Sequence, residues 1–136
     1  MEGNPVIAAY LQTRYWVDGH DEPILIGACN PQLDQLLQKQ GLSTWAYITA
    51  WNPLSQMHLD LENHRRNTQL LKELTGFLVL KGKGEGQNGD WPPEESFLVL
   101  GISRQEAEQL GRLHGQRAIV FGGIGKPAEL VITVPF

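Results

Sequence analysis

The run Thr44–Pro53, TWAYITAWNP, is the segment that most constrains the fold of this chain. Successive side chains of a β-strand point to opposite faces of the sheet, so this run has one aromatic face and one face of smaller residues. The second face, which carries Ala46 and Ile48, allows a helix to pack closely. Proline cannot donate a ladder hydrogen bond, so the strand is predicted to end at Asn52. We therefore expect a central strand over 44–52 with a helix against one face.

Capping residues mark the predicted helices. The chain begins as a short helix before a strand through Tyr15 and Val17, and further helices are predicted after Asn30, Asp60 and Ser103. Further strands are predicted at 23–27, 77–82 and 96–102, with a terminal hairpin over 118–136. The predicted core consists of Trp45, Ile48, Leu70, Leu74, Leu98, Leu100, Leu110 and Ile119. This order predicts an α+β fold, a single domain over 1–136 with a mixed, largely antiparallel sheet packed with about three helices.

The composition and charge of the chain argue against several classes of function. The net charge of −4 argues against binding to a nucleic-acid backbone, which needs many basic residues. No apolar run approaches the roughly 20 residues of a membrane helix, and the N-terminus lacks the basic region of a secretory signal. A single cysteine, Cys29, cannot form an internal disulfide, so a cytoplasmic location is predicted. The spacing of the histidines fits no metal site, and we predict neither a metal nor a cofactor.

The stretch Lys81–Ser96, KGKGEGQNGDWPPEES, is rich in glycine but does not match a phosphate-binding loop. Such a loop leads directly into a helix, whereas two prolines and a strand follow here. We predict that Gly82–Asn88 is a flexible connection. Trp91 and the prolines bring a stiff aromatic segment to the start of a strand that carries Glu94 and Ser96. This segment is either a tryptophan cover over the core or the wall of a pocket that contains Glu94.

The helix after Asp60 has a face that is apolar near its end and polar near its start, where Asn63 and Arg66 lie. The polar part is either a solvated helix start or part of a site beside the end of the central strand. We predict that Asn63 and Arg66 converge with Asn52 and Glu94. In that arrangement Arg66 contacts Glu94, either as a structural clamp or as part of a ligand site.

The chain resembles a bacterial family known as domain of unknown function 3293. The resemblance rests on the blocks Ala9–Tyr15, Ile48–Pro53, Glu62–Leu71, Trp91–Ile102 and Gly115–Gly123. The recurring family positions correspond to Thr49, Asn52, Pro53, Glu62, Asn63, Arg66, Trp91, Pro93, Glu94, Ser96 and Gln116. Glu95 stands where relatives often carry proline. The resemblance implies a small cytoplasmic bacterial protein and supplies no activity.

Three functions remain open from the sequence. The first is the binding of a small polar or nucleotide-like ligand, anionic or neutral, at the end of the central strand. Its predicted site consists of Thr49, Trp51, Asn52, Asn63, Arg66, Trp91, Glu94, Ser96 and Gln116. The second is a metal-independent hydrolase or transferase in which Glu94 is the general base and Arg66 stabilises negative charge. The third is a protein-interaction module, with self-association through the terminal strands.

Overall fold

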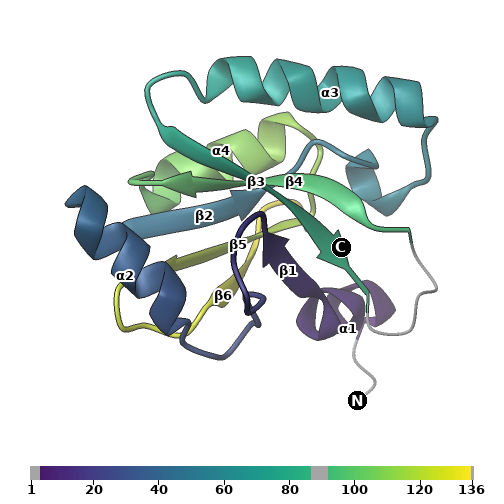
Figure 1. Cartoon of the computed structure of the whole chain (residues 1–136). Helices are drawn as coiled ribbons and strands as arrows, with labels where there is room; N and C mark the ends of the chain where they lie inside the picture. The colour runs from purple at the N-terminus through teal and green to yellow at the C-terminus, as the bar shows by residue number, and fades with distance from the viewer. Residues whose placement is uncertain (1–3, 87–91, 136) are drawn as a thin grey trace.

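The computed structural model describes residues 4–86 and 92–135. Its centre is a six-stranded sheet with the order β1-β3-β4-β2-β5-β6 (Figure 1). The strands are β1 (Arg14–Val17), β2 (Thr44–Ile48), β3 (Leu78–Glu85), β4 (Glu94–Leu100), β5 (Ala118–Gly123) and β6 (Glu129–Ile132). The helices are α1 (Pro5–Gln12), α2 (Pro31–Gln40), α3 (Asp60–Glu73) and α4 (Arg104–Leu113), with a 3-10 turn, η1, at Pro53–Ser55. The predicted α+β class is confirmed.

The sheet separates two hydrophobic clusters. On one face, Leu33 and Leu37 of α2 pack with the aromatic side of β2, which includes Trp45. On the other face, α3 and α4 pack against the small side of the same strand, where Ala46 lies. Figure 1 shows α3 and α4 on one side of the sheet and α1 and α2 on the other. The prediction that a helix packs against the small face of β2 is therefore confirmed. The predicted core is buried, except that Leu110 is only partly buried.

Two of the predicted helix starts are confirmed. The Asn30 side chain accepts a hydrogen bond from the Leu33 amide at 3.0 Å, and Ser103 with Glu106 forms a capping box. The third start differs, because the N-cap of α3 is Leu59 and Asp60 is the first helical residue. Asp60 therefore stabilises the helix through its negative charge near the positive end of the dipole rather than as a cap.

The glycine-rich stretch is partly strand, so the prediction of a flexible connection from Gly82 is wrong for its first residues. β3 continues to Glu85, and Gly82 pairs with both Val17 and Ser96. A Cβ at Gly82 would lie 1.9 Å from the Trp16 carbonyl oxygen, so only glycine fits between these strands. The part of the prediction that concerns residues 87–88 lies outside the described residues.

The sheet also departs from the prediction in its pairing. All five strand pairs of the described sheet are antiparallel rather than mixed. The predicted strand at 23–27 forms only isolated bridges, from Ile24 to Tyr15 and, in parallel, from Ile26 to Ala128. The predicted central strand is shorter as well, because its ladder ends at Ile48.

Candidate functional site

Two buried asparagines on α3 determine the path of the chain after β2 ends. The Ala50 amide donates to Asn67 Oδ1 at 2.8 Å, and the Asn52 amide donates to Asn63 Oδ1 at 2.8 Å. Asn63 and Asn67 lie one helical turn apart, with only 1% and 3% of their surfaces exposed. Side chains of α3 thus take the place of a neighbouring strand for these two amides.

The segment that follows has a strained backbone. Asn52, Leu54 and Ser55 have φ values of 46°, 57° and 59°, in the left-handed region. That region is unfavourable for most residues other than glycine, and least so for asparagine. A hydrogen bond from the Leu54 amide to the Gly115 carbonyl, at 2.7 Å, holds the turn in place. Such strain persists only where the surrounding structure imposes it, and it is common at functional sites.

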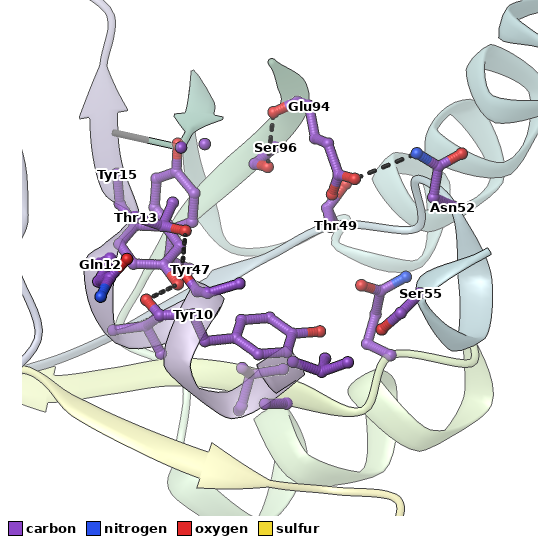
Figure 2. A pocket seen from close by; sticks show the side chains of 18 of the residues that line it. Tyr10, Gln12, Thr13, Tyr15, Tyr47, Thr49, Asn52, Ser55, Glu94 and Ser96 are labelled. Carbon is purple, nitrogen blue, oxygen red and sulfur yellow. Dashed lines mark hydrogen bonds between the residues drawn. The ribbon is translucent and has the colours of Figure 1, made fainter. Parts of the chain in front are cut away.

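The Asn52 side chain is oriented by its own contacts. Its Oδ1 accepts from the His58 amide at 2.9 Å and from Asn63 Nδ2 at 2.8 Å. Its Nδ2 therefore faces the other way and donates to Glu94 Oε2 at 3.1 Å (Figure 2). The chain thus brings three of the four predicted residues together: Asn52, Asn63 and Glu94.

Asn52 and Glu94 lie at one end of a cavity of about 360 Å³ between α1 and the sheet. The sequence of α1, PVIAAYLQ, is largely apolar, yet none of its residues is buried, all of them within the described chain. Val6, Ala9 and Tyr10 line the cavity instead. The inner side of α1 therefore covers an open space rather than packing on the core.

The floor of the cavity is apolar and aromatic. It is lined by Ala118, Ile119 and Val120 of β5 and by the rings of Tyr15 and Tyr47. The two rings meet edge to face, with centroids 5.2 Å apart. Their hydroxyls are engaged in the framework: that of Tyr15 donates to the Tyr10 carbonyl at 2.9 Å, and that of Tyr47 to the Trp16 carbonyl at 2.6 Å. These tyrosines therefore present their rings to the cavity.

Tyr10 contributes both an aromatic ring and a hydroxyl group to the cavity wall. Its hydroxyl points across the cavity toward Ser55 (Figure 2). Partial burial raises the pKa of the Tyr10 phenol, and the Glu94 carboxylate raises this pKa further. A nearby Ser55 hydroxyl acts in the opposite direction. Tyr10 is therefore protonated at neutral pH and is a hydrogen-bond donor there.

Five of the nine predicted site residues line the cavity: Thr49, Asn52, Glu94, Ser96 and Gln116. Most of their polar groups have partners in the protein. The Thr49 hydroxyl donates to the Glu95 carbonyl at 2.6 Å, that of Ser96 to the Glu94 carbonyl at 3.0 Å, and Gln116 Nε2 to the Trp51 carbonyl at 3.2 Å. Ser96 is thus held in place by a backbone group rather than by a general base.

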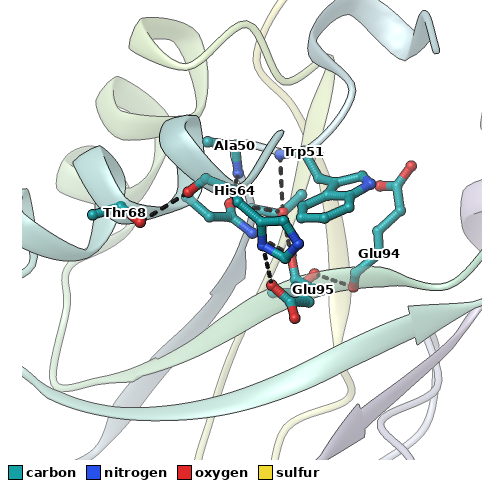
Figure 3. Close-up of polar contacts among 9 residues, drawn as sticks. Ala50, Trp51, His64, Thr68, Glu94 and Glu95 are labelled. Atoms are coloured by element: carbon teal, nitrogen blue, oxygen red, sulfur yellow. Dashed lines mark hydrogen bonds and ion pairs between the residues drawn. The ribbon is translucent and has the colours of Figure 1, made fainter. Parts of the chain in front are cut away.

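The remaining predicted residues have other positions. Asn63 is buried behind Asn52 and positions it. Trp51 lies on the α3 side, edge-on to His64 with ring centroids 4.9 Å apart (Figure 3). On that side His64 Nδ1 pairs with Glu95 Oε2 at 3.3 Å. Trp91 lies outside the described residues.

Arg66 requires a correction. Its side chain is exposed, it does not line the cavity, and no ion pair joins it to Glu94 within 4.0 Å, both residues being described. The buried face of α3 consists of positions 63, 67 and 70, and Arg66 lies to the side of that face, toward solvent. The predicted direct contact between Arg66 and Glu94 is therefore wrong, and Asn52 contacts Glu94 instead.

Sequence reasoning missed the residues that α1 and its surroundings contribute, namely Tyr10, Tyr15, Tyr47 and Ser55. The block Ala9–Tyr15 belonged to the resemblance, and its two tyrosines were the available signal. Their role was not visible because a helix over a cavity has the same apolar pattern as a helix over a core.

Two further searches covered the described residues alone. Within 4–86 and 92–135 no helix is long and apolar enough to cross a bilayer. The same residues contain no group of three or more His, Cys, Asp or Glu side chains placed to hold a metal ion.

These features define a small α+β protein with a helix-covered pocket beside a strained turn. The chain belongs to the family described as protein of unknown function (DUF3293), whose model matches residues 48–119. That match includes the turn at Asn52, the asparagines of α3 and Glu94, but not α1. No curated protein and no solved structure matches the chain.

Proposed function

We propose that this protein binds a small polar organic molecule, of about the size of a nucleobase or nucleoside, in the cavity under α1. The main support for the proposal is that the largely apolar helix α1 covers a space of about 360 Å³. All residues of α1 are described, and none of them is buried. Apolar surface facing an empty cavity forgoes packing energy, which a bound ligand would restore. The volume lies at the small end of the range for ligand sites.

The chemistry of the walls supports the same proposal. An apolar floor with a few convergent polar groups is the usual composition of a small-molecule site. Here Tyr15 and Tyr47 contribute aromatic rings to the lining, while Tyr10, Asn52 and Glu94 bring polar groups to one end. The strained turn at 52–55 places two of its side chains in this wall, which is the kind of site where strain is retained.

The alternative of a hydrolase or transferase has less support. It assigned the stabilisation of negative charge to Arg66, which is exposed and does not line the cavity. The Ser96 hydroxyl donates to a backbone carbonyl at 3.0 Å. No histidine is among the described residues that line the cavity, which leaves Glu94 as the general base that this alternative assigned.

The test fills the cavity from α1. Ala9 lines the cavity and Ala8, its neighbour on the same helix, does not, so Ala9→Phe and Ala8→Phe make a matched pair. A library of small aromatic and heterocyclic fragments is screened by thermal shift, since binding to the folded state raises the melting temperature. We expect fragments that stabilise the wild type and the Ala8→Phe variant but not Ala9→Phe. Equal stabilisation of both variants, or no stabilising fragment at all, contradicts the proposal.

A further inference from the structure

A buried glutamine presents a hydrogen-bond acceptor to the cavity. Gln116 lines the cavity and has 5% of its surface exposed. Its Nε2 donates to two carbonyl oxygens, that of Trp51 at 3.2 Å and that of His114 at 3.4 Å. A carbonyl oxygen can only accept, so the nitrogen end of the amide must face these two groups. Trp51 and His114 are both described and neither lines the cavity, so the opposite end of the amide, Gln116 Oε1, faces the cavity.

This oxygen is open to a ligand. Within the described chain, residues 4–86 and 92–135, no donor forms a hydrogen bond to Gln116 Oε1. The oxygen is not sealed in the interior either, so it is accessible from the cavity. Covering an accessible acceptor costs free energy unless the covering molecule supplies a donor. The wall therefore favours a ligand that places an N–H group at this point.

The acceptor is held in position before any ligand arrives. The Gln116 backbone amide donates to the Gly111 carbonyl at 2.8 Å, and the Gln116 carbonyl accepts from the Thr133 hydroxyl. The side-chain nitrogen is held by the carbonyls of Trp51 and His114. Because the residue is fixed at its backbone and at its amide, little ordering entropy is lost when Oε1 accepts from a ligand.

A hydrogen-bond donor lies beside the same segment of the chain. The Tyr10 hydroxyl points into the cavity from α1 (Figure 2). Partial burial is the largest cause of the raised pKa of Tyr10, and the Arg117 charge and the Ala118 backbone act against it. These two residues directly follow Gln116, so the phenol lies beside the segment that carries the acceptor. Tyr10 is protonated at neutral pH and can donate to a carbonyl of the ligand.

We infer that the ligand carries a lactam or imide edge, which is an N–H beside a C=O on a flat ring. The N–H donates to Gln116 Oε1, and the C=O accepts from the Tyr10 hydroxyl. The ring packs with the aromatic rings of Tyr15 and Tyr47 in the lining. This inference rests on the proposed function and specifies the chemical class of its ligand.

The test uses two probes of nearly the same shape. The ring of 2-quinolone carries an N–H beside its carbonyl, and in coumarin an oxygen replaces that N–H. Coumarin would place a second acceptor against Gln116 Oε1, so the comparison isolates the proposed hydrogen bond. Dissociation constants are measured near neutral pH by protein-detected NMR titration, which registers weak binding. We expect 2-quinolone to bind at least about tenfold more tightly than coumarin.

Two glutamines supply the matched variants. Gln116→Met removes the acceptor and retains a side chain of similar length. Gln109→Met makes the same change at an exposed position of α4 that does not line the cavity. We expect Gln116→Met to reduce the preference for 2-quinolone to below about threefold and Gln109→Met to retain it in full. Tyr10→Phe should weaken both probes to a similar extent, because both keep the carbonyl.

Gln116→Met also leaves the carbonyls of Trp51 and His114 without their donor, so its folding is checked in the same NMR spectra. If this variant does not fold, the two probes on the wild type and on Tyr10→Phe decide.

The inference is overturned if 2-quinolone and coumarin bind equally, if coumarin binds more tightly, or if neither binds. It is also overturned if a folded Gln116→Met keeps the full preference, or if Tyr10→Phe leaves both affinities unchanged. These results leave the proposed function to its own test, because the comparison of Ala9→Phe with Ala8→Phe uses fragments with and without N–H groups. Failure of that comparison removes the pocket itself.

Discussion

The replacement of Asn63 by alanine tests how the turn beside the pocket is held. Asn63 accepts from the Asn52 amide at 2.8 Å and donates to Asn52 Oδ1 at 2.8 Å, with 1% of its surface exposed. Each of the two hydrogen bonds contributes about 1 kcal/mol, and a buried amide left without a partner costs about 1–3 kcal/mol. Alanine regains a few tenths of a kcal/mol through its helix propensity. The net expected loss of stability is about 2–4 kcal/mol.

The measurement is urea-induced unfolding, with the free energy taken from the midpoint and slope of the transition. Arg66→Ala is the matched control on the same helix, because Arg66 is exposed and should change stability by no more than about 0.5 kcal/mol. A double-mutant cycle with Asn52→Ala should show a coupling of about 0.5–3 kcal/mol. The reasoning would be refuted if Asn63→Ala lost less than about 1 kcal/mol of stability, or if Asn63→Ala and Arg66→Ala lost the same amount.

Two further changes test the sheet. Gly82→Ala places a Cβ 1.9 Å from the Trp16 carbonyl and 2.7 Å from the Tyr47 hydroxyl, whereas Gly86 has nothing within 4 Å. In urea unfolding we expect Gly82→Ala to cost about 1–3 kcal/mol or more and Gly86→Ala to cost little; similar effects would argue against the close approach of β1 and β3. Burial raises the pKa of Tyr10, Tyr15 and Tyr47 above 10.0, so the folded state holds these protons more tightly than the unfolded chain. Their contribution to stability is therefore complete below pH 10.0 and is lost as the pH rises above it. The urea midpoint should fall above that pH, and a smaller fall is expected for Tyr47→Phe; an unchanged midpoint would contradict the burial of the phenols.

Features that depend on local chemistry could be predicted from the sequence. The Asn30 cap and the Ser103–Glu106 capping box involve residues close in the chain, and both form as expected. The alternation of β2 predicted that a helix would pack against its face of small residues, and α3 and α4 pack there.

Features that depend on distant contacts could not be predicted. After Ile48 the alternation no longer applies, because Asn63 and Asn67 bind the amides of the departing chain, and Trp51 consequently lies toward His64. Glu94 contacts Asn52 rather than Arg66 because α3 is rotated so that Asn63 and Asn67 face inward and Arg66 faces solvent. The sequence does not specify this rotation. The glycines of β3 led to the prediction of a loop. The reason for Gly82 in a strand is the close approach of the Trp16 carbonyl, which the sequence does not reveal.

The loose fit of α1 has a kinetic consequence for whatever occupies the cavity. Two hydrogen bonds hold its C-terminal end. The Tyr15 hydroxyl donates to the Tyr10 carbonyl at 2.9 Å, and the Thr13 hydroxyl donates to the Ala9 carbonyl at 2.6 Å. No buried side chain, in this fully described helix, anchors the rest. Segments with few buried contacts open at a small fraction of the free energy needed to unfold the whole protein. We therefore expect α1 to open about its C-terminal end while the sheet stays folded, so that the residence time of the proposed ligand is governed by the opening of α1.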